Sequence, residues 1–448
     1  MSKRFTKTAR RLLSGSLSLC LPLAAALWAP SARAEEPSTS GALVPPEPPP
    51  PPPPPGQTGE PARSPADEPP PEFPSDAFLP AADDPRIPSF LRALRLGQDS
   101  LLLGAYLQPG FRYVVDTDFN EDDSDGFFFQ NARLIGKGEI TFWKKLGAGV
   151  RFDFDVAQGS FAVKDVYGTL SWDKDLVAMD VGQLKVPLGL AELQPEARQQ
   201  FAVASAARKI MFGRDLGIQL RSDFPIGPVW FRLAGMIANG EGGFRQRINL
   251  DNQFLYAGRL EIAPLGRMQW SESELDDTAK PQLTAGFSAG HNSALGNELG
   301  IADAGAGETR IGGDLRFWWR GLSIRGEYLH AFRGDNDGSL AFERYAATAQ
   351  IGYVLPIPIP FPKFEIVSRF TQYDLNRTAD GTEGDQYVPE NTEARVLEFG
   401  ANAYVAKHAT KVSFLYQLTD LLEGPMTDEN GDVLIGDTVY VVTQFAWL

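Results

Sequence analysis

The sequence predicts an all-β protein: a sixteen-stranded antiparallel transmembrane β-barrel that follows a disordered, Pro-rich N-terminal segment. Three observations predict it. Apolar and polar residues alternate from residue 101 to the last residue. The alternating segments are mostly about ten to thirteen residues long, which is the length a tilted strand needs to cross a bilayer. Short and long connections alternate between them, as they do in outer-membrane barrels.

Residues 1–34 have the pattern of a secretory signal peptide. Five basic residues occur between Lys3 and Arg11, an apolar run covers residues 12–28, and Ala32–Ala34 reads Ala-Arg-Ala, a cleavage signal. Serine and glycine interrupt the apolar run, which disfavours the alternative of a permanent membrane anchor. The only cysteine, Cys20, lies inside this peptide and follows a leucine. We therefore expect neither lipidation nor a disulfide in the mature chain.

Residues 35–90 form a different kind of segment. They contain the run Pro45–Gly56 and ten acidic residues against two basic ones. Such a composition cannot bury a core, and a polyproline run is an extended, semi-rigid spacer. We predict a disordered linker on the periplasmic side, with docking of a partner as the alternative, and a barrel over residues 91–448.

The alternating segments indicate sixteen strands, and one of them shows the principle. In Val150–Val156 one face is Val, Phe, Phe, Val, whereas Arg151, Asp153 and Asp155 form the other. We expect the apolar face to meet lipid and the charged face to meet water inside a pore, because repeated inward charges are too costly in a packed core. The predicted strands are 101–116, 128–143, 147–157, 161–173, 176–189, 214–224, 229–240, 254–265, 282–292, 309–320, 322–334, 345–356, 364–374, 394–407, 410–420 and 438–448.

The connections repeat on two sides. Short turns, which we place in the periplasm, are 144–147, 173–175, 225–228, 320–321 and 407–410. Long connections, which we place outside the cell, are 190–213, 241–253, 293–308, 335–344, 375–393 and 421–437. Segment 266–281 is long on the short side and 157–161 is short on the long side, so the strand register is doubtful at both. A soluble β-sandwich or β-helix, the alternative, predicts neither the count nor this alternation.

Three stretches carry a resemblance to a known family. They are Val181–Gly189 (VGQLKVPLG), Phe212–Leu220 (FGRDLGIQL) and Gly235–Gly242 (GMIANGEG). Their order and spacing resemble the phosphate-selective porin O and P family over roughly residues 100–448. The residues that match the motifs are Gly182, Gln183, Lys185, Pro187, Arg214, Asp215, Gly217, Asn239 and Gly240.

The resemblance implies an outer-membrane porin for passive diffusion of small anions such as phosphate. It further implies a homotrimer with loops folded into the lumen, surrounded by lipid and lipopolysaccharide and inserted by the barrel-assembly machinery. Barrels of this kind usually end on an aromatic residue, whereas here Trp447 is penultimate. No cofactor, metal ion or nucleic acid is expected.

The charge does not fit an anion pore at first sight. The chain after residue 34 has 36 basic and 57 acidic residues, a net charge of −21, which repels anions. The connection 190–213 is cationic, however, and reads as a short helix beginning near Pro195. Folded into the lumen, it would form a basic constriction. The constriction residues would be Lys185, Arg198, Arg208, Lys209 and Arg214, followed by a lumen ladder of Arg151, Arg259, Arg316 and Arg325.

Two alternatives for these charges and two rival functions stay open. The arginines could simply pair with lumen acids such as Asp153, Asp155 and Glu261. A non-selective pore, or one for an organic solute, could use the inward aromatic residues Trp230, Trp318 and Tyr404. An enzyme is disfavoured, because the chain has only three histidines, no Gly-x-Ser-x-Gly motif and no zinc-type His spacing. A histidine and a serine lie close together in the sequence at one place, His291 and Ser293 in Gly290–Ser293.

Overall fold

The computed structural model describes most of the predicted barrel. The described residues are 94–95, 102–115, 125–143, 145–157, 159, 161–173, 176–242, 249, 252–293, 307–334, 340–359, 362–375, 393–422 and 437–447. The predicted signal peptide and the predicted linker lie outside them. Within the described residues, no helix is both long enough and apolar enough to cross a membrane.

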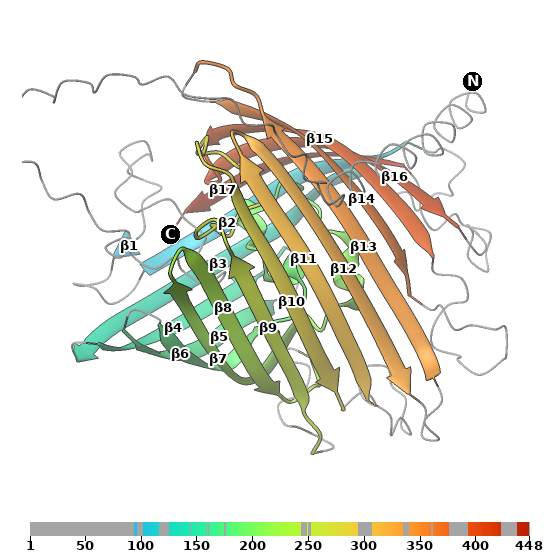
Figure 1. Ribbon diagram of the computed structural model, residues 1–448. Helices are drawn as coiled ribbons and strands as arrows, with labels where there is room; N and C mark the ends of the chain where they lie inside the picture. Colours follow the sequence, from blue (N-terminus) through green and yellow to red (C-terminus); the bar gives the residue numbers. More distant parts are fainter. Residues whose placement is uncertain are drawn as a thin grey trace, which may run out of the picture. The chain divides into compact units, whose positions relative to one another are not determined.

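Sixteen strands, β2 to β17, form one closed antiparallel barrel (Figure 1). Each strand pairs with the next along the chain, and β17 returns to pair with β2. A two-residue strand, β1 (Leu94–Arg95), adds to β2. The barrel strands are β2 Leu102–Val114, β3 Gly126–Trp143, β4 Leu146–Asp155, β5 Ala162–Trp172, β6 Val177–Lys185, β7 Arg214–Ile226, β8 Val229–Ala238, β9 Leu255–Ala263, β10 Gln282–Asn292, β11 Glu308–Trp319, β12 Leu322–Gly334, β13 Leu340–Val354, β14 Lys363–Asp374, β15 Ala394–Ala406, β16 Thr410–Leu421 and β17 Thr438–Trp447.

The predicted fold class and strand count are confirmed, and two strand boundaries were wrong by more than two residues. The strand predicted over 345–356 begins at Leu340. The strand predicted over 176–189 ends at Lys185. Residues 186–189 leave the barrel wall there, and Val186, Leu188 and Gly189 are buried in the lumen. The apolar run continued past the wall, so alternation alone could not mark the end of the strand.

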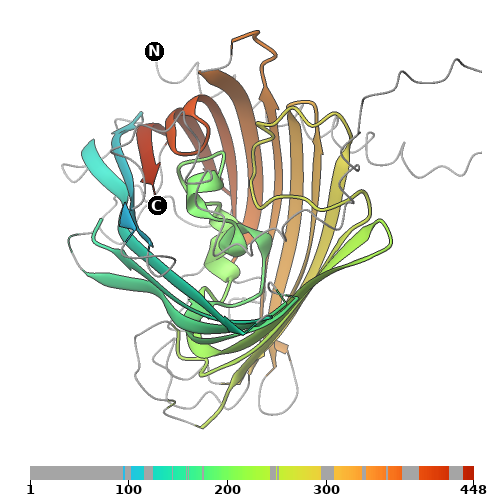
Figure 2. The same cartoon turned by 90° about the vertical axis from the view of Figure 1, so that its left-hand side faces the viewer.

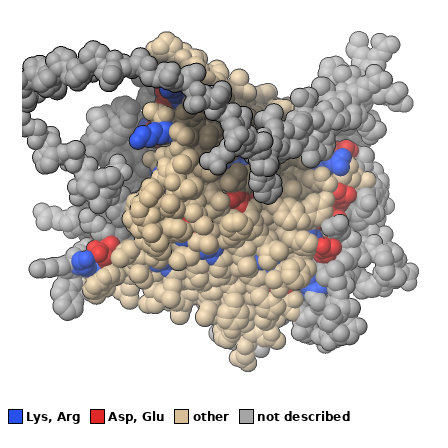
Figure 3. Space-filling view, viewed as in Figure 1, with Lys and Arg blue, Asp and Glu red and all other residues tan. Residues whose placement is uncertain are grey.

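The outer face is apolar, as the alternation predicts. Leu220, Ile237, Phe287 and Ile324 point outward and are exposed. Figure 3 shows that this face carries few charged side chains, most of them near its edges. A broad apolar band bordered by charge is the surface that a lipid bilayer requires of a barrel.

The inner face differs from the prediction. Arg151, Asp153 and Asp155 point inward, but they do not meet open water: they are 4%, 0% and 7% exposed. Arg133 on β3 lies 3.4 Å from Asp153 and 3.5 Å from Asp155. The lumen is therefore lined by packed ion pairs, which satisfy the charges that water was expected to solvate.

Two connections fill the lumen and take the place of that water. The long insert, residues 186–213, lies within the ring of strands (Figure 2). It is not the single short helix that the alanines predicted. It contains one helical turn, α2 (Leu190–Leu193), and two 3-10 helices, η3 (Glu196–Arg198) and η4 (Ala206–Ile210). Pro195 precedes η3. Gln199 and Gln200, which follow η3, form hydrogen bonds with the barrel wall and do not continue a helix.

The short-side insert, residues 264–281, enters from the end of the barrel that carries the short turns. Its neighbours β9 and β10 pair directly, with Ile262 opposite Ala285, so the register is regular. Met268, Trp270 and Leu275 of this insert are buried. At the other doubtful joint, Asp155 pairs with Ala162, so the connection there is truly short. Both exceptions to the loop rule are therefore real features of the barrel.

Candidate functional site: a charged cavity in the lumen

The long insert is held by polar side chains of the opposite wall. Gln200 donates to Ser323 Oγ at 2.7 Å and to Glu365 Oε1 at 2.6 Å. The backbone carbonyls of the insert accept from the wall as well: Lys411 Nζ reaches the Gln199 oxygen at 2.5 Å. These bonds come from β12, β14 and β16, so the insert crosses the lumen from the wall that carries it to the wall that faces it.

The two inserts contact each other in the middle of the barrel. The Glu272 amide donates to the Arg198 carbonyl at 3.0 Å, and the Gln200 amide donates to the Glu272 carboxylate at 2.8 Å. Trp270 packs with Leu190 and Leu193 of the long insert. The long insert is bonded to β12, β14 and β16, and a cavity lies between the two inserts and the wall formed by β3 to β9.

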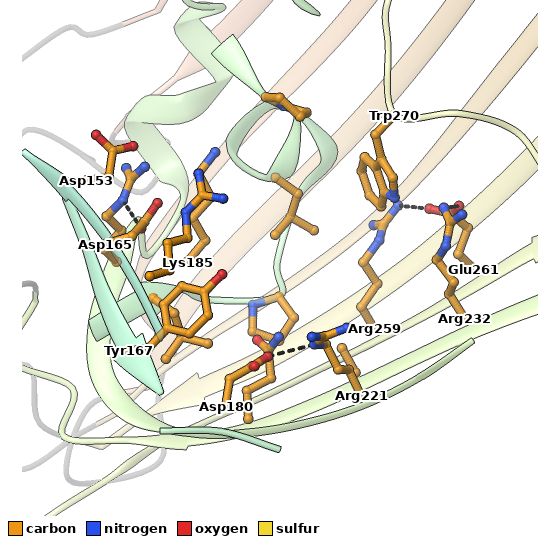
Figure 4. A pocket seen from close by; sticks show the side chains of 18 of the residues that line it. Asp153, Asp165, Tyr167, Asp180, Lys185, Arg221, Arg232, Arg259, Glu261 and Trp270 are labelled. Carbon is orange, nitrogen blue, oxygen red and sulfur yellow. Dashed lines mark hydrogen bonds and ion pairs between the residues drawn. The ribbon is translucent and has the colours of Figure 1, made fainter. Parts of the chain in front are cut away.

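That space is a cavity of about 80 Å³ (Figure 4). Volume of this kind holds roughly five water molecules, or a small solute in their place. Side chains of the wall and of both inserts line it. Seven of them are basic and five acidic: Arg133, Arg151, Lys185, Arg214, Arg221, Arg232 and Arg259 against Asp153, Asp165, Asp180, Glu196 and Glu261.

The acids of the cavity are engaged by arginines. Asp180 accepts from Arg221 Nε at 2.7 Å, and Asp165 accepts from Arg214 Nε at 2.7 Å. Glu261 takes three partners: Arg232 at 2.7 Å, Arg316 at 2.8 Å and Arg259 at 3.4 Å. The lining thus contains two more basic than acidic side chains, although Arg232 and Arg259 also pair with Asp223 at 2.9 Å and with Asp314 at 2.7 Å, acids that do not line the cavity.

Lys185 accounts for part of that excess. Its ammonium group donates to two backbone carbonyls of the long insert, Glu192 at 2.5 Å and Gln194 at 3.4 Å. Among the described residues no carboxylate lies within ion-pair distance of it. Carbonyl dipoles solvate the ammonium without cancelling its charge.

Acids of the long insert are fixed in the ionised state. Glu196 is buried, which opposes ionisation, but its ion pairs with Arg133 and Arg208 outweigh burial and hold its pKa well below the ordinary value. Arg208 also donates to Glu192 at 2.7 Å, and its charge likewise lowers the Glu192 pKa against the effect of burial. The insert therefore brings its own counter-charges into the lumen.

The predicted constriction is only partly assembled. Four of the predicted basic residues line the cavity: Arg151, Lys185, Arg214 and Arg259. The others lie elsewhere: Arg208 pairs with Glu192 and Glu196, Arg316 with Glu261, and Arg325 with Glu272 and Glu327. Arg198 contributes its carbonyl to the contact with Glu272. Lys209 is exposed and touches Tyr373, with its ammonium 2.9 Å from the hydroxyl.

The alternative that lumen arginines pair with lumen acids is thus confirmed for most of them. For Asp153 and Asp155, the partner is Arg133, which the sequence analysis did not select. It also missed Arg221 and Arg232 on the wall and Trp270 on the short-side insert. The three arginines occupy inward positions of predicted strands, so applying the alternation to every strand finds them. Trp270 lies in a connection, where alternation carries no information.

The residues of the family motifs fix the sheet and mostly do not line the cavity. Gly182 and Gly217 are direct cross-strand partners. Gln183 donates to the carbonyls of Val163 and Lys164 at 2.8 and 2.7 Å. Asp215 accepts from the Gly240 amide at 2.8 Å, and the Asn239 amide donates to the Leu216 carbonyl. Of these motif residues Pro187 alone, besides Lys185 and Arg214, borders the cavity.

A second cavity continues the first toward the short turns. It shares Arg151, Tyr167 and Arg221 with the first cavity. Beyond them it is lined by Lys137, Glu139 and small residues of β4 and β5. The two cavities therefore lie on the same side of the lumen, separated by the residues they share.

The rival functions find little support in the geometry. Ser271 Oγ lies 2.9 Å from His408 Nε2, but Ser271 also donates to the Ser273 carbonyl, and neither residue borders the cavities. His291, in the Gly290–Ser293 stretch, bonds Thr309 on the exposed outer face. No group of side chains suited to a metal ion occurs among the described residues.

The three aromatic residues predicted for an organic-solute track do not line the main cavity. Trp318 and Tyr404 are 5% and 0% exposed and pack the lumen wall. Tyr404 bonds Ser273 and Glu365, so it serves to hold the short-side insert. Trp230 stacks on Arg267, whose guanidinium lies 4.7 Å from the ring centre.

Comparisons with known proteins agree on the architecture. No family model and no curated protein matches the chain. Among solved structures, OmpT of Vibrio cholerae in its trimer form is 12% identical, with a TM-score of 0.51 over 78% of this chain and 99% of that one. Salmonella typhi OmpF in complex with daunomycin is 14% identical, with a TM-score of 0.51 over 79% of this chain and all of that one. The chain has the fold of an outer-membrane β-barrel.

Proposed function

We propose that the chain is an outer-membrane channel through which small anions diffuse passively. The observation that supports this is the cavity beside the inserts, where seven basic side chains face five acidic ones. The acidic excess of the whole chain does not decide selectivity in this proposal, because the local field at the narrowest point acts most strongly on a permeating ion.

The route runs along the wall formed by β3 to β9. A solute would enter near the exposed Lys209 at the end that carries the long connections. It would then pass Arg214 and Lys185, cross the cavity, and leave between Arg151 and Arg221 toward the short turns. The tight ion pairs on this route keep its shape fixed, and Lys185, whose ammonium is held by two backbone carbonyls, contributes attraction for anions.

Phosphate as the solute, the homotrimer, and the partners lipopolysaccharide and barrel-assembly machinery remain proposals that stem from the family resemblance. The trimer is checked by the mass of the purified protein–detergent complex. After the mass of bound detergent is subtracted, a trimer has three times the mass of one chain. Phosphate is checked by its ability to reduce the chloride current through a single channel.

The test of anion diffusion is the reversal potential of the purified protein in a planar bilayer under a KCl gradient. We expect anion preference in the wild type. Lys185→Glu should lower the anion-to-cation permeability ratio by about tenfold at low salt, since it reverses the charge at the cavity. Lys145→Glu, at an exposed turn where Lys145 pairs with Asp173, is the matched control and should leave the ratio unchanged. Cation preference in the wild type would contradict the proposal.

A further inference from the structure

One side chain of the long insert is bonded to three neighbouring strands of the wall. The side-chain nitrogen of Gln200 donates to Ser323 Oγ on β12 at 2.7 Å and to Glu365 Oε1 on β14 at 2.6 Å. Its side-chain oxygen accepts from Gln350 Nε2 on β13 at 2.6 Å. Gln200 is 1% exposed. Water therefore competes little for these bonds, and a buried polar network whose groups are paired is rigid.

The backbone of the same residue joins the long insert to the short-side insert and to a fourth strand. The Gln200 amide donates to the Glu272 carboxylate at 2.8 Å, and Asn402 Nδ2 on β15 donates to the Gln200 carbonyl at 2.9 Å. Glu272 also accepts from Gln350 Nε2 at 3.0 Å and pairs with Arg325. Each polar group of Gln200 thus has a partner, and the partners come from four consecutive strands and from the second insert.

Glu365 makes a similar connection from the side of the wall. Its carboxylate accepts from Gln200 of the long insert at 2.6 Å and from Ser273 of the short-side insert at 3.0 Å. Tyr404 and Asn402 of β15 donate to the same carboxylate at 2.7 and 3.0 Å. Since one carboxylate of β14 takes bonds from both inserts, the two inserts are fixed to the same area of the wall.

The wall leaves room for the Gln200 side chain at a glycine. Gly352 of β13 is buried and lies opposite Ser323 of β12 in the sheet register. A Cβ on Gly352 would overlap the Gln200 side-chain nitrogen and would lie 2.9 Å from its Cδ and 2.8 Å from Ser323 Oγ. The three nearest atoms belong to side chains and none to the backbone. An alanine at this position would therefore displace the Gln200 amide from its bonds and leave the strands in place.

The cavity lies on the other side of the two inserts. Leu193, Pro195 and Glu196 of the long insert and Trp270 of the short-side insert line it, whereas Gln200 is bonded to β12, β13, β14 and β15. On the wall side the inserts are close-packed, and on the cavity side they border empty space. Inserts that lose their bonds to the wall would therefore move toward the cavity and narrow the passage beside β3 to β9.

We infer that Gln200 is a positioning residue, which clamps both inserts to the wall formed by β12 to β15 and so keeps the passage beside β3 to β9 open. This inference rests on the proposed channel, but it applies to a channel of either ion preference. Gln200 brings no charge to the passage. It acts on permeation through the position of the inserts, and Gly352 supplies the space that its side chain needs.

The experiment records single channels of the purified protein in planar bilayers in KCl at a fixed voltage. Gln200→Met keeps the length of the side chain and removes its hydrogen bonds. It should raise the ratio of closed to open time by about tenfold, because the loss of several buried hydrogen bonds changes an equilibrium on that scale. The reversal potential under a KCl gradient should keep its wild-type value, since no charged group is removed.

Gly352→Ala tests the same clamp from the wall and carries the test alone if Gln200→Met fails to assemble. It should also raise the closed-to-open ratio. In a Gln200→Ala background Gly352→Ala should add nothing, because the side chain that it displaces is gone. The matched control is Gly326→Ala on β12, where the nearest atom to a Cβ is the Thr348 carbonyl oxygen at 3.9 Å. This control should keep the wild-type ratio.

Wild-type closed-to-open ratios in both Gln200→Met and Gly352→Ala would overturn this inference, even if urea unfolding shows the two variants to be less stable. Additive effects of Gln200→Ala and Gly352→Ala would overturn it as well. Both results leave the proposed function standing, because that function is judged by the reversal potential of the wild type. Cation preference in the wild type would overturn the proposed function, whereas more frequent closure of the two variants in such a channel would still support the clamp.

Discussion

At the scale of single residues, Glu196 ties the long insert to the barrel wall. It pairs with Arg133 of the wall and with Arg208 of the insert, so it joins two elements by charge. Removing one partner of a buried ion pair leaves the other charges uncompensated. The neighbouring arginines therefore add to the backbone hydrogen bonds that hold η3.

We expect Glu196→Gln to lower the free energy of unfolding by about 3 kcal/mol. The measurement is urea unfolding of the protein in lipid vesicles, followed by tryptophan fluorescence. Lys145→Gln is the control, because its ion pair with Asp173 is 54% and 38% exposed and should be worth less than about 1 kcal/mol. An equal decrease in the free energy of unfolding in the two variants would show that the Glu196 ion pairs stabilise the barrel no more than an exposed pair does.

His408 makes stability depend on pH. It lies in the turn between β15 and β16, and burial together with Arg198, Lys411 and Lys407 holds its pKa well below the ordinary value. The folded chain keeps His408 neutral while the unfolded chain protonates it near pH 6.5. Stability is therefore complete above that pH and falls as the pH drops below it.

The corresponding prediction is a free energy of unfolding that declines between about pH 6.5 and pH 5 in the wild type. His408→Gln, which keeps a donor for Ser271, should show a clearly smaller decline. His291→Gln is the control, since His291 lies on the exposed outer face. A decline of the same size in His408→Gln would assign the pH dependence to other groups.

At the scale of the strands, close approach explains the motif glycines on β6 and β7. A Cβ on Gly182 would lie 2.3 Å from the Val166 carbonyl oxygen, and one on Gly217 would lie 2.2 Å from the Ile237 carbonyl oxygen. Gly182 also has a φ of 143°, which side chains rarely tolerate. Both positions lie on the two strands that flank the long insert.

Gly182→Ala and Gly217→Ala should each reduce the folded fraction, because a Cβ only 2.2 to 2.3 Å from a backbone oxygen forces the backbone to move before the methyl group fits. A cost of about 1–3 kcal/mol is the scale of such overpacking. The folded fraction is read from the shift in gel migration between unheated and heated samples. Gly235→Ala, whose Cβ would meet nothing within 4 Å, should fold like the wild type; a defect there equal to the other two would contradict the steric account.

The strands were largely predictable from sequence, whereas the lumen contents were not. Alternation identifies Arg325 and Glu327 as inward and Ile324 as outward because it reads one strand at a time, and the structure agrees. It cannot show that Arg325 pairs with Glu272, which lies 53 positions away in a connection. Nor can it place Trp270 at the cavity, since connections lack a period. The cationic insert was located correctly, but its ion pairs depend on long-range geometry.

At the scale of the whole molecule, the barrel separates two environments. The outer face requires apolar side chains at mid-height and tolerates polar ones at the rim. Leu220 and Ile226 test this on the same strand: both belong to β7 and are exposed, and Ile226 ends the strand at the short turn. The inner face obeys a different rule, because its charges are compensated by partners from distant strands.

Leu220→Arg should therefore lower the free energy of unfolding from vesicles by about 2–4 kcal/mol, and Ile226→Arg by about 1 kcal/mol or less. The measurement is urea-dependent folding into lipid vesicles of one composition. Equal costs at the two positions would mean that the bilayer does not centre on this band of the barrel.

The long insert has a further consequence for the order of folding. By sequence it belongs to the first half of the barrel, yet Gln444 of the last strand donates to the Ala197 carbonyl at 2.8 Å. Lys411 and Asn402 of late strands hold Gln199 and Gln200 in the same way. Contacts between such distant positions form slowly. The insert reaches its final place only after β16 and β17 have arrived, so a chain that lacks its C-terminal strands has an unfinished interior as well as an open wall.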